Sequence, residues 1–256
     1  MNEDPKTVGF RILSTVSIVV DGNVVRTGAG HESTLLALLV ANPGYAFAID
    51  SIVTAVWGAN PPAVANRSLH VYISKLRRLL ATHSPGPTPI SGGAGWYRLD
   101  VDPQHTDIGR FRTLIAAARS TAHDNANLYR RALAEITGDA LAGLPTTPFT
   151  CSFRETVAEM ALDAEIAMYS ASRPRFHPTE VTARMRELAT EHPYDERLWA
   201  MLIEALHASG RRAEAVLAGR QLTAALADRL GLDPSADLIE LLRRVETDPG
   251  YTRASA

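Results

Sequence analysis

The chain has 256 residues, a formal net charge of −2 at neutral pH and a single cysteine, Cys151. At this length we expect two domains of ordinary size. One cysteine cannot form an intramolecular disulfide, and the N-terminus lacks the basic and apolar regions of a signal peptide. The longest apolar run, Leu35 to Ala41, is far shorter than the roughly 20 residues that span a bilayer. The sequence therefore predicts a cytoplasmic protein without a membrane partner.

Charge is distributed unevenly along the chain. Residues 1–100 carry 8 basic and 6 acidic side chains, whereas residues 101–256 carry 18 basic and 22 acidic ones. Within the first part, the stretch from Ser51 to Leu99 holds five basic and no acidic side chains. We therefore expect the two halves to face different partners, and the basic stretch to face a negatively charged one.

The first elements predicted are short strands followed by helices. Residues from Val8 to Thr27 are rich in β-branched and aromatic side chains, and Asp21-Gly22-Asn23 is typical of a hairpin turn. A helix follows and ends before Asn42-Pro43-Gly44. A second, short helix is expected after it, with Asp50 or Ser51 as its cap.

The third helix is predicted over Ala63 to Leu80, where the basic residues concentrate. Leucine and isoleucine recur there at i, i+4, i+7 and i+11, which makes one apolar stripe of a helix. The face opposite that stripe gathers basic and hydroxyl side chains, which suit phosphates and base edges. The stripe consists of Leu69, Ile73, Leu76 and Leu80, and the opposite face of Arg67, Ser68, Val71, Ser74, Lys75 and Arg78. This pattern predicts a DNA recognition helix.

The chemistry of each side chain assigns it a role on DNA. Lys75 can reach guanine O6 or N7 in the major groove, and Val71 can touch a thymine methyl group. Arg98, on a later hairpin, either binds a phosphate or faces water. The remaining candidates are phosphate contacts that fix the register of the protein on the duplex: Arg67, Ser68, Tyr72, Ser74 and either Arg77 or Arg78. The alternative explanation for this face is a solvated surface without a partner.

A hairpin closes the N-terminal domain. The proline-rich stretch Ser84–Pro89 is a loop, and Ile90–Val101 is predicted to form a hairpin with a glycine-rich tip. Strands, three helices and a terminal hairpin are typical of a winged helix. From Thr106 onward every recognisable element is helical. We therefore expect a DNA-binding domain over residues 1–105 and a helical domain over residues 106–256.

Two segments near the C-terminus resemble each other. Glu187–Leu198 and Ala227–Leu238 both combine a helix, a proline-containing turn, an acidic cap and a second helix. Their prolines, Pro193 and Pro234, are 41 positions apart. The fold class expected is an α+β winged helix followed by an all-α domain of tetratricopeptide-like helical hairpins.

Several motifs together resemble a known family. Arg67-Ser-Leu-His-Val-Tyr-Ile-Ser-Lys-Leu-Arg-Arg78 and Gly95-Trp-Tyr-Arg-Leu99 are similar to the recognition helix and the wing strand of OmpR/PhoB-type winged helices. The rest resembles the bacterial transcriptional activation domain of the Streptomyces antibiotic regulatory protein (SARP) family. The motifs that carry this likeness are Ile49–Gly58, Asp107-Ile-Gly-Arg-Phe111, Gly138–Leu144, Ser209–Ala215 and Leu230-Gly-Leu-Asp-Pro234.

The resemblance implies a transcriptional activator that binds direct repeats of double-stranded DNA as head-to-tail pairs. It also implies that the helical domain engages RNA polymerase and its principal sigma factor, with genes of secondary metabolism as targets. The chain has no Gly-x-x-x-x-Gly-Lys-Ser/Thr motif, so it resembles the small form of the family, without an ATPase module.

Two departures from the family pattern affect the DNA face. Where relatives commonly carry Lys or Arg at the start of the first helix, this chain has His31-Glu32-Ser33. The wing tip, Ser91 to Gly95, lacks the arginine that relatives commonly carry there. DNA binding through the wing is therefore expected to be weaker or driven by shape.

No catalytic or metal-binding pattern occurs in the sequence. The eight histidines are scattered, Cys151 has no partner cysteine, and no Gly-x-Ser-x-Gly motif is present. We therefore expect neither an enzyme nor a bound cofactor.

Two other functions stay open at this stage. One is a protein-interaction adaptor with a degenerate winged helix, favoured by Glu32 and the glycine-only wing. The other is a sensor whose helical domain takes a small molecule or peptide between its helices. The side chains that would line such a groove are Met160, Met168, Tyr169, Phe176, Tyr194 and Trp199.

Overall fold

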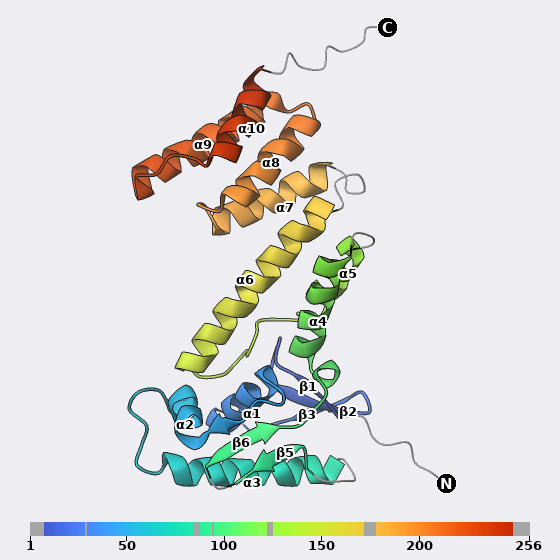
Figure 1. The fold of residues 1–256 in the computed structure, drawn as a ribbon, viewed down its shortest axis with the longest axis vertical. Helices are drawn as coiled ribbons and strands as arrows, with labels where there is room; N and C mark the ends of the chain where they lie inside the picture. Colours follow the sequence, from blue (N-terminus) through green and yellow to red (C-terminus); the bar gives the residue numbers. More distant parts are fainter. Residues whose placement is uncertain are drawn as a thin grey trace, which may run out of the picture. The chain divides into compact units, whose positions relative to one another are not determined.

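The computed structural model describes residues 8–28, 30–83, 88–93, 95–121, 125–171 and 178–247 (Figure 1). The chain divides into two compact units, Met1–Glu165 and Ile166–Ala256. Among the described helices, none combines the length and apolar character needed to cross a membrane.

The first unit begins with a three-stranded antiparallel sheet in the order β1-β2-β3. Its strands are β1 (Val8–Arg11), β2 (Ser17–Val20) and β3 (Asn23–Arg26). Phe10 lies opposite Ile18, and both side chains are buried in the core. Asp21 and Gly22 adopt positive φ angles of 50° and 82°, as a tight hairpin requires. The predicted Asp-Gly-Asn turn is therefore confirmed.

Three helices follow the sheet: α1 (His31–Ala41), α2 (Ile49–Trp57) and α3 (Ala65–His83). Helix α1 is buried from Ser33 to Ala41 and packs against α2, α3 and the strand β6 (Trp96–Leu99). It is apolar on nearly all sides because it lies at the centre of this unit.

The predicted cap of α2 is wrong. The residue before the helix is Ala48, which makes no side-chain cap bond, and Asp50 already lies in the first turn. Ala48 is extended because the two-residue strand β4 (Phe47–Ala48) pairs with β6. The Ile49 amide donates to the Gly95 carbonyl at 3.0 Å. Strand pairing, not a capping side chain, therefore sets the start of α2.

The predicted hairpin is present as β5 (Ile90–Gly92) and β6, in a sheet of order β4-β6-β5. Gly92 has φ +112°, and a Cβ there would lie 2.2 Å from the Trp96 carbonyl oxygen. A side chain at this position is therefore incompatible with the hairpin. Residues 84–87 of the predicted loop and Ala94 of the predicted wing tip lie outside the described residues.

After the hairpin, the chain turns through the short helix η1 (Pro103–His105) into α4 (Asp107–Ser120). The Asp107 carboxylate accepts hydrogen bonds from the backbone amides of Ile12 and Leu13, both at 2.8 Å, and from that of Ile108 at 2.7 Å. Burial raises the pKa of Asp107, an effect that these amide donors and the Arg110 charge oppose. The start of α4 is thereby fastened to the chain just after β1.

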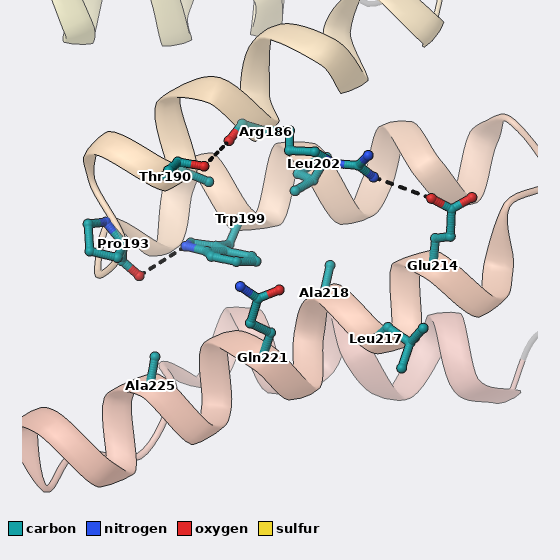
Figure 2. Close-up of a pocket in the computed structure, with 11 residues that line it drawn as sticks. Arg186, Thr190, Pro193, Trp199, Leu202, Glu214, Leu217, Ala218, Gln221 and Ala225 are labelled. Carbon is teal, nitrogen blue, oxygen red and sulfur yellow. Dashed lines mark hydrogen bonds and ion pairs between the residues drawn. The ribbon is translucent and has the colours of Figure 1, made fainter.

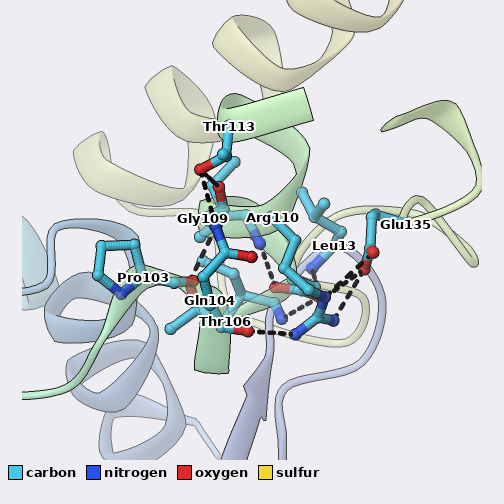
Figure 3. Close-up of polar contacts among 11 residues, drawn as sticks. Leu13, Pro103, Gln104, Thr106, Gly109, Arg110, Thr113 and Glu135 are labelled. Atoms are coloured by element: carbon cyan, nitrogen blue, oxygen red, sulfur yellow. Dashed lines mark hydrogen bonds and ion pairs between the residues drawn. The ribbon is translucent and has the colours of Figure 1, made fainter. Parts of the chain in front are cut away.

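Figure 3 shows the polar contacts that surround this turn. The Thr106 hydroxyl caps α4 by accepting from the Gly109 amide at 2.9 Å. A Cβ on Gly109 would lie 2.0 Å from the Pro103 carbonyl oxygen, so only glycine fits. Arg110 makes a two-pronged ion pair with Glu135, with Nη2 2.8 Å from Oε2. Within the Asp107–Phe111 motif, Asp107, Gly109 and Arg110 therefore each have a defined structural role.

Two further helices complete the first unit, α5 (Asn125–Leu133) and the long α6 (Pro148–Ala171), which crosses into the second unit. Thr147 and Thr150 cap α6 reciprocally, because each backbone amide donates to the other side-chain oxygen. Arg154 of α6 donates to the Ala140 carbonyl at 3.1 Å and to the Leu141 carbonyl at 2.8 Å. Its guanidinium therefore ties α6 to the turn that precedes it.

The second unit contains helical hairpins, as predicted from the two similar segments. Its complete helices are α7 (Pro178–Glu191), α8 (Glu196–Ala208), α9 (Arg212–Leu230) and α10 (Ala236–Thr247). Helix α8 packs against α7 and α9, and α10 packs against α8 and α9. Asp195 caps α8 by accepting from the Arg197 amide at 3.0 Å. Each helix thus covers its neighbour, as in tetratricopeptide-like arrays.

Candidate nucleic-acid interface

Helix α3 presents the face that the sequence predicts. The four members of its apolar stripe are at most 1% exposed, so the opposite face points away from the core. On that face Arg67, Val71, Ser74, Lys75 and Arg78 are exposed, whereas Ser68 and Tyr72 are half-buried. Helix α3 contains no acidic residue, so its exposed face is basic along its length.

Lys75, at the middle of this face, has an acidic neighbour. Its Nζ is 3.5 Å from Glu32 Oε2 and 5.9 Å from the centre of the Tyr72 ring. The Lys75 side chain is 58% exposed, but that of Glu32 is only 12% exposed because it lies against Gly28. Glu32 is therefore held in place beside the basic face, and Lys75 remains accessible to a ligand.

Arg77 and Arg78 differ in their surroundings. Arg77 donates from Nε to the Ile90 carbonyl at 3.0 Å and from Nη2 to the Gly92 carbonyl at 2.9 Å. Its guanidinium also lies 5.6 Å from the Tyr97 ring centre. Arg77 therefore fastens the wing to α3, whereas Arg78 is exposed.

A second link joins α3 to the wing. His70 Nδ1 is 2.8 Å from the Tyr97 hydroxyl, and the Tyr97 ring is buried. Neither this contact nor the role of Arg77 was predicted, because His70 and Tyr97 are 27 positions apart and no local pattern joins them. Together they hold the hairpin at a fixed position beside the recognition helix.

Arg98 lies on β6 of the wing and is partly engaged. Its Nε is 2.5 Å from Asp100 Oδ1, and its guanidinium is 5.5 Å from the Trp96 ring centre. The side chain is 38% exposed, so it can still reach an outside phosphate. Trp96 itself is 39% exposed and supports Arg98 rather than the core.

Trp57 is half-buried at the end of α2. Its ring lies parallel to that of Tyr72, with centroids 6.1 Å apart, and 5.2 Å from the ring of His31. The aromatic rings thus connect the start of α1, the end of α2 and the middle of α3. They fix the position of the basic face on the three-helix core.

The second unit contains a hollow of about 500 Å³ between α7, α8 and α9 (Figure 2). Trp199 lies in it and donates from Nε1 to the Pro193 carbonyl at 3.0 Å. Leu217, on its rim, is 62% exposed, and Arg186 pairs with Glu214 at 3.3 Å. Of the predicted aromatic and methionine cluster, Trp199 lines this hollow, Met168 is buried, and Phe176 lies outside the described residues.

No group of three or more potential metal ligands occurs among the described residues. The side chains that α3 exposes include cations, hydroxyls and a valine. This set matches phosphates and base edges.

Two family profiles match the chain. Residues 26–94 match the profile "Transcriptional regulatory protein, C terminal", and residues 106–246 match the "Bacterial transcriptional activator domain". Together with the winged-helix region and the helical hairpins, these matches place the chain in a family of transcriptional regulators.

Individual relatives agree with this class. The chain is 32% identical over 246 residues to the transcriptional regulatory protein EmbR of Mycobacterium bovis, and 31% identical over 254 residues to the regulatory protein DnrI of Streptomyces peucetius. The alignment with EmbR covers 94% of this chain and 63% of EmbR, and the alignment with DnrI covers 91% of this chain and 90% of DnrI. Regulatory protein AfsR of Streptomyces coelicolor is 31% identical over 260 residues, 99% of this chain and 26% of AfsR. The chain belongs to the Streptomyces antibiotic regulatory protein family.

A solved structure shares the fold. The structure of Mycobacterium tuberculosis EmbR in complex with a low-affinity phosphopeptide superposes with a TM-score of 0.86 at 32% sequence identity. The superposition covers 94% of this chain and 65% of the EmbR chain. The chain thus spans a little under two thirds of EmbR.

Proposed function

We propose that this transcriptional regulator is a sequence-specific activator that binds double-stranded DNA through the exposed face of α3. The observation that carries this proposal is the acid-free basic face of α3, directed away from the core by a buried apolar stripe. A helix of this shape fits the major groove, where base edges carry a distinct pattern for each base pair.

Each side chain has its role in this proposal. Lys75 and Val71 read bases, as an exposed ammonium and an exposed valine at the centre of the face. Arg98 contacts a phosphate from the wing, and Arg77 positions that wing. The phosphate contacts on the helix are Arg67, Ser68, Tyr72, Ser74 and Arg78.

We assign DNA binding to residues 1–105 and activation to residues 106–256. The activation part contacts RNA polymerase and its principal sigma factor, and copies of the chain associate head to tail on direct repeats near secondary-metabolite genes. The hollow around Trp199 supports this role, because the exposed Leu217 and the apolar floor offer a surface for an apolar segment of the polymerase or sigma factor.

A selection experiment tests the DNA-binding proposal. Purified full-length protein is mixed with sheared genomic DNA, bound fragments are recovered over several rounds, and the enriched sequences are compared. We expect an enriched direct repeat whose spacing places two recognition helices on the same side of the duplex. Recovery of fragments without a common repeat contradicts the proposal.

The adaptor function has one specific observation in its favour, the ion pair of Lys75 with Glu32, which places an acid beside the basic face. If the face binds DNA, Glu32→Gln removes repulsion from phosphates and should strengthen duplex binding about two- to fivefold. The exposed Glu155→Gln on α6 is the matched control and should leave affinity unchanged. Absence of duplex binding by both the wild type and Glu32→Gln in a fluorescence titration favours the adaptor instead.

A further inference from the structure

A basic hollow lies in the first unit, apart from the exposed face of α3. It has a volume of about 550 Å³ and lies between the sheet β1-β2-β3, the start of α1 and the turn before α6. Among the residues that the structure describes, no Asp or Glu lines this hollow. The lining residues that the proposal uses are Arg11, Ser17, Arg26, Thr27, Gly30 and Ser33.

The sheet register places two arginines on either side of a serine. Arg11 of β1 pairs with Ser17 of β2, and Ser17 pairs with Arg26 of β3. Residues directly opposite one another in an antiparallel sheet project from the same face, so all three side chains point to the same side. Both arginines are exposed, and within the described part of the chain neither has an acidic partner.

Ser17 contributes a hydroxyl to the lining of this hollow. The residue is only 6% exposed, and it lies between the two arginines in the sheet register. A hydroxyl can donate a hydrogen bond to an acceptor that enters the hollow.

The start of α1 adds further donors. Gly30, the residue that precedes α1, has no side chain to cap the first amides, and a helix N-terminus favours an anion. Ser33 Oγ donates to the Gly28 carbonyl and lies 2.8 Å from Thr27 Oγ1, so these hydroxyls bond within the protein and the free donors are the backbone amides. The nearby acid, Glu32, lies against Gly28 and pairs with Lys75, and it does not line the hollow.

We propose that this hollow binds the phosphate group of a small phosphate monoester. Arg11 and Arg26 supply the charge, and Ser17 and the amides at the start of α1 supply hydrogen bonds. The volume lies in the range of small-ligand pockets. A phosphate on the surface of a duplex does not reach Ser17, which is 6% exposed, whereas a small ligand inside the hollow does. This inference is independent of DNA binding by α3.

The test uses inorganic phosphate as the probe on the full-length protein, without DNA. Binding is followed by isothermal titration calorimetry and by the change in Tm at constant ionic strength, with chloride as the reference salt. The variants are Arg11→Gln with Arg26→Gln, Ser17→Ala, and the control Arg119→Gln, an exposed arginine of α4. Sugar phosphates are compared with the same sugars without phosphate.

We expect phosphate to raise Tm in the wild type and in Arg119→Gln. The double arginine variant should weaken phosphate binding at least tenfold, and Ser17→Ala several-fold. A sugar phosphate should bind more tightly than inorganic phosphate, and the free sugar should not bind. Equal phosphate affinity in the double variant and the wild type overturns the proposal. The proposal is also overturned if the double variant keeps its phosphate affinity but binds the duplex more weakly. That result assigns Arg11 and Arg26 to contacts with the DNA backbone.

Discussion

At the scale of single residues, Lys75 and Arg67 occupy different places on the same helix face. Lys75 lies at the middle of α3 and near Tyr72, whereas Arg67 lies in the first turn, where α3 begins. A side chain at the centre of a helix in the major groove reaches bases, and one near its end reaches the backbone.

Lys75→Ala should therefore cost about 1 to 3 kcal/mol on the selected site and relax preference at one position. Arg67→Ala should weaken operator and scrambled duplexes by the same factor, because a phosphate contact carries no sequence information. Titrations of both variants against both duplexes measure the difference. An equal loss on the two duplexes for Lys75→Ala shows that Lys75 does not read bases.

At the scale of elements, the wing shows which glycines the hairpin requires. Gly92 and Gly95 have φ angles of +112° and +108°, so a side chain is strained at both. Gly93 is exposed, its φ is not in this region, and a Cβ there meets nothing within 4 Å. Gly93 is therefore the position in the wing that accepts a side chain without disturbing the hairpin.

Gly93→Arg should tighten duplex binding and steepen the slope of log K against log salt by about one, since the added charge displaces one counterion. Gly93→Gln is the matched control, with a long side chain but no charge, and should leave the slope unchanged. The slope is measured from titrations at several salt concentrations. If Gly93→Arg and Gly93→Gln give the same slope, the wing does not approach the phosphates.

The helical unit allows a comparable test on one helix. Leu217 and Leu230 both lie on α9 and are 62% and 48% exposed, but only Leu217 lines the hollow around Trp199. Leu217→Glu should reduce activation about tenfold, which corresponds to roughly 1.4 kcal/mol, while DNA affinity stays unchanged. Leu230→Glu should behave as the wild type in a transcription assay at equal occupancy. Full activation by Leu217→Glu rules out this hollow as the activating surface.

Elements with a local pattern could be predicted from the sequence. The Asp21–Asn23 turn, the stripe of α3 and the hairpins around Pro193 follow from spacing and turn residues, and they are present in the structure. The strand β4 could not be predicted, because two residues leave no pattern and its pairing with β6 joins distant segments. The contact by which Arg77 anchors the wing could not be predicted for the same reason. The sequence around an arginine on a basic helix face is the same whether its guanidinium binds backbone carbonyls or solvent.

At the scale of the whole first unit, Asp107 joins the winged-helix region to the helices that follow. Its carboxylate accepts from the amides of Ile12 and Leu13, and the Leu141 amide donates to the Ile12 carbonyl at 3.0 Å. Arg112 of α4 adds a hydrogen bond to the Ala41 carbonyl at 2.7 Å. Residues on both sides of position 105 therefore form one compact unit that extends to Glu165.

Asp107→Asn should lower the free energy of unfolding by about 1 to 3 kcal/mol, because an amide has one oxygen and leaves a buried backbone donor unpaired. Asp102→Asn is the matched control: its carboxylate caps η1 on the surface, and asparagine caps equally well. The midpoint of urea unfolding measures both. An unchanged midpoint for Asp107→Asn contradicts the role of this carboxylate as the junction.

We propose that the basic face of α3 brings this chain to a promoter, where the chain activates transcription. The most direct measurement is transcription in vitro with purified RNA polymerase and principal sigma factor from a promoter that carries the selected direct repeat. We predict that the full-length protein raises the transcript level and that the double variant Arg67→Ala, Lys75→Ala does not. A transcript level that stays at the polymerase-only value while the repeat is fully occupied by the wild-type protein would contradict the claim.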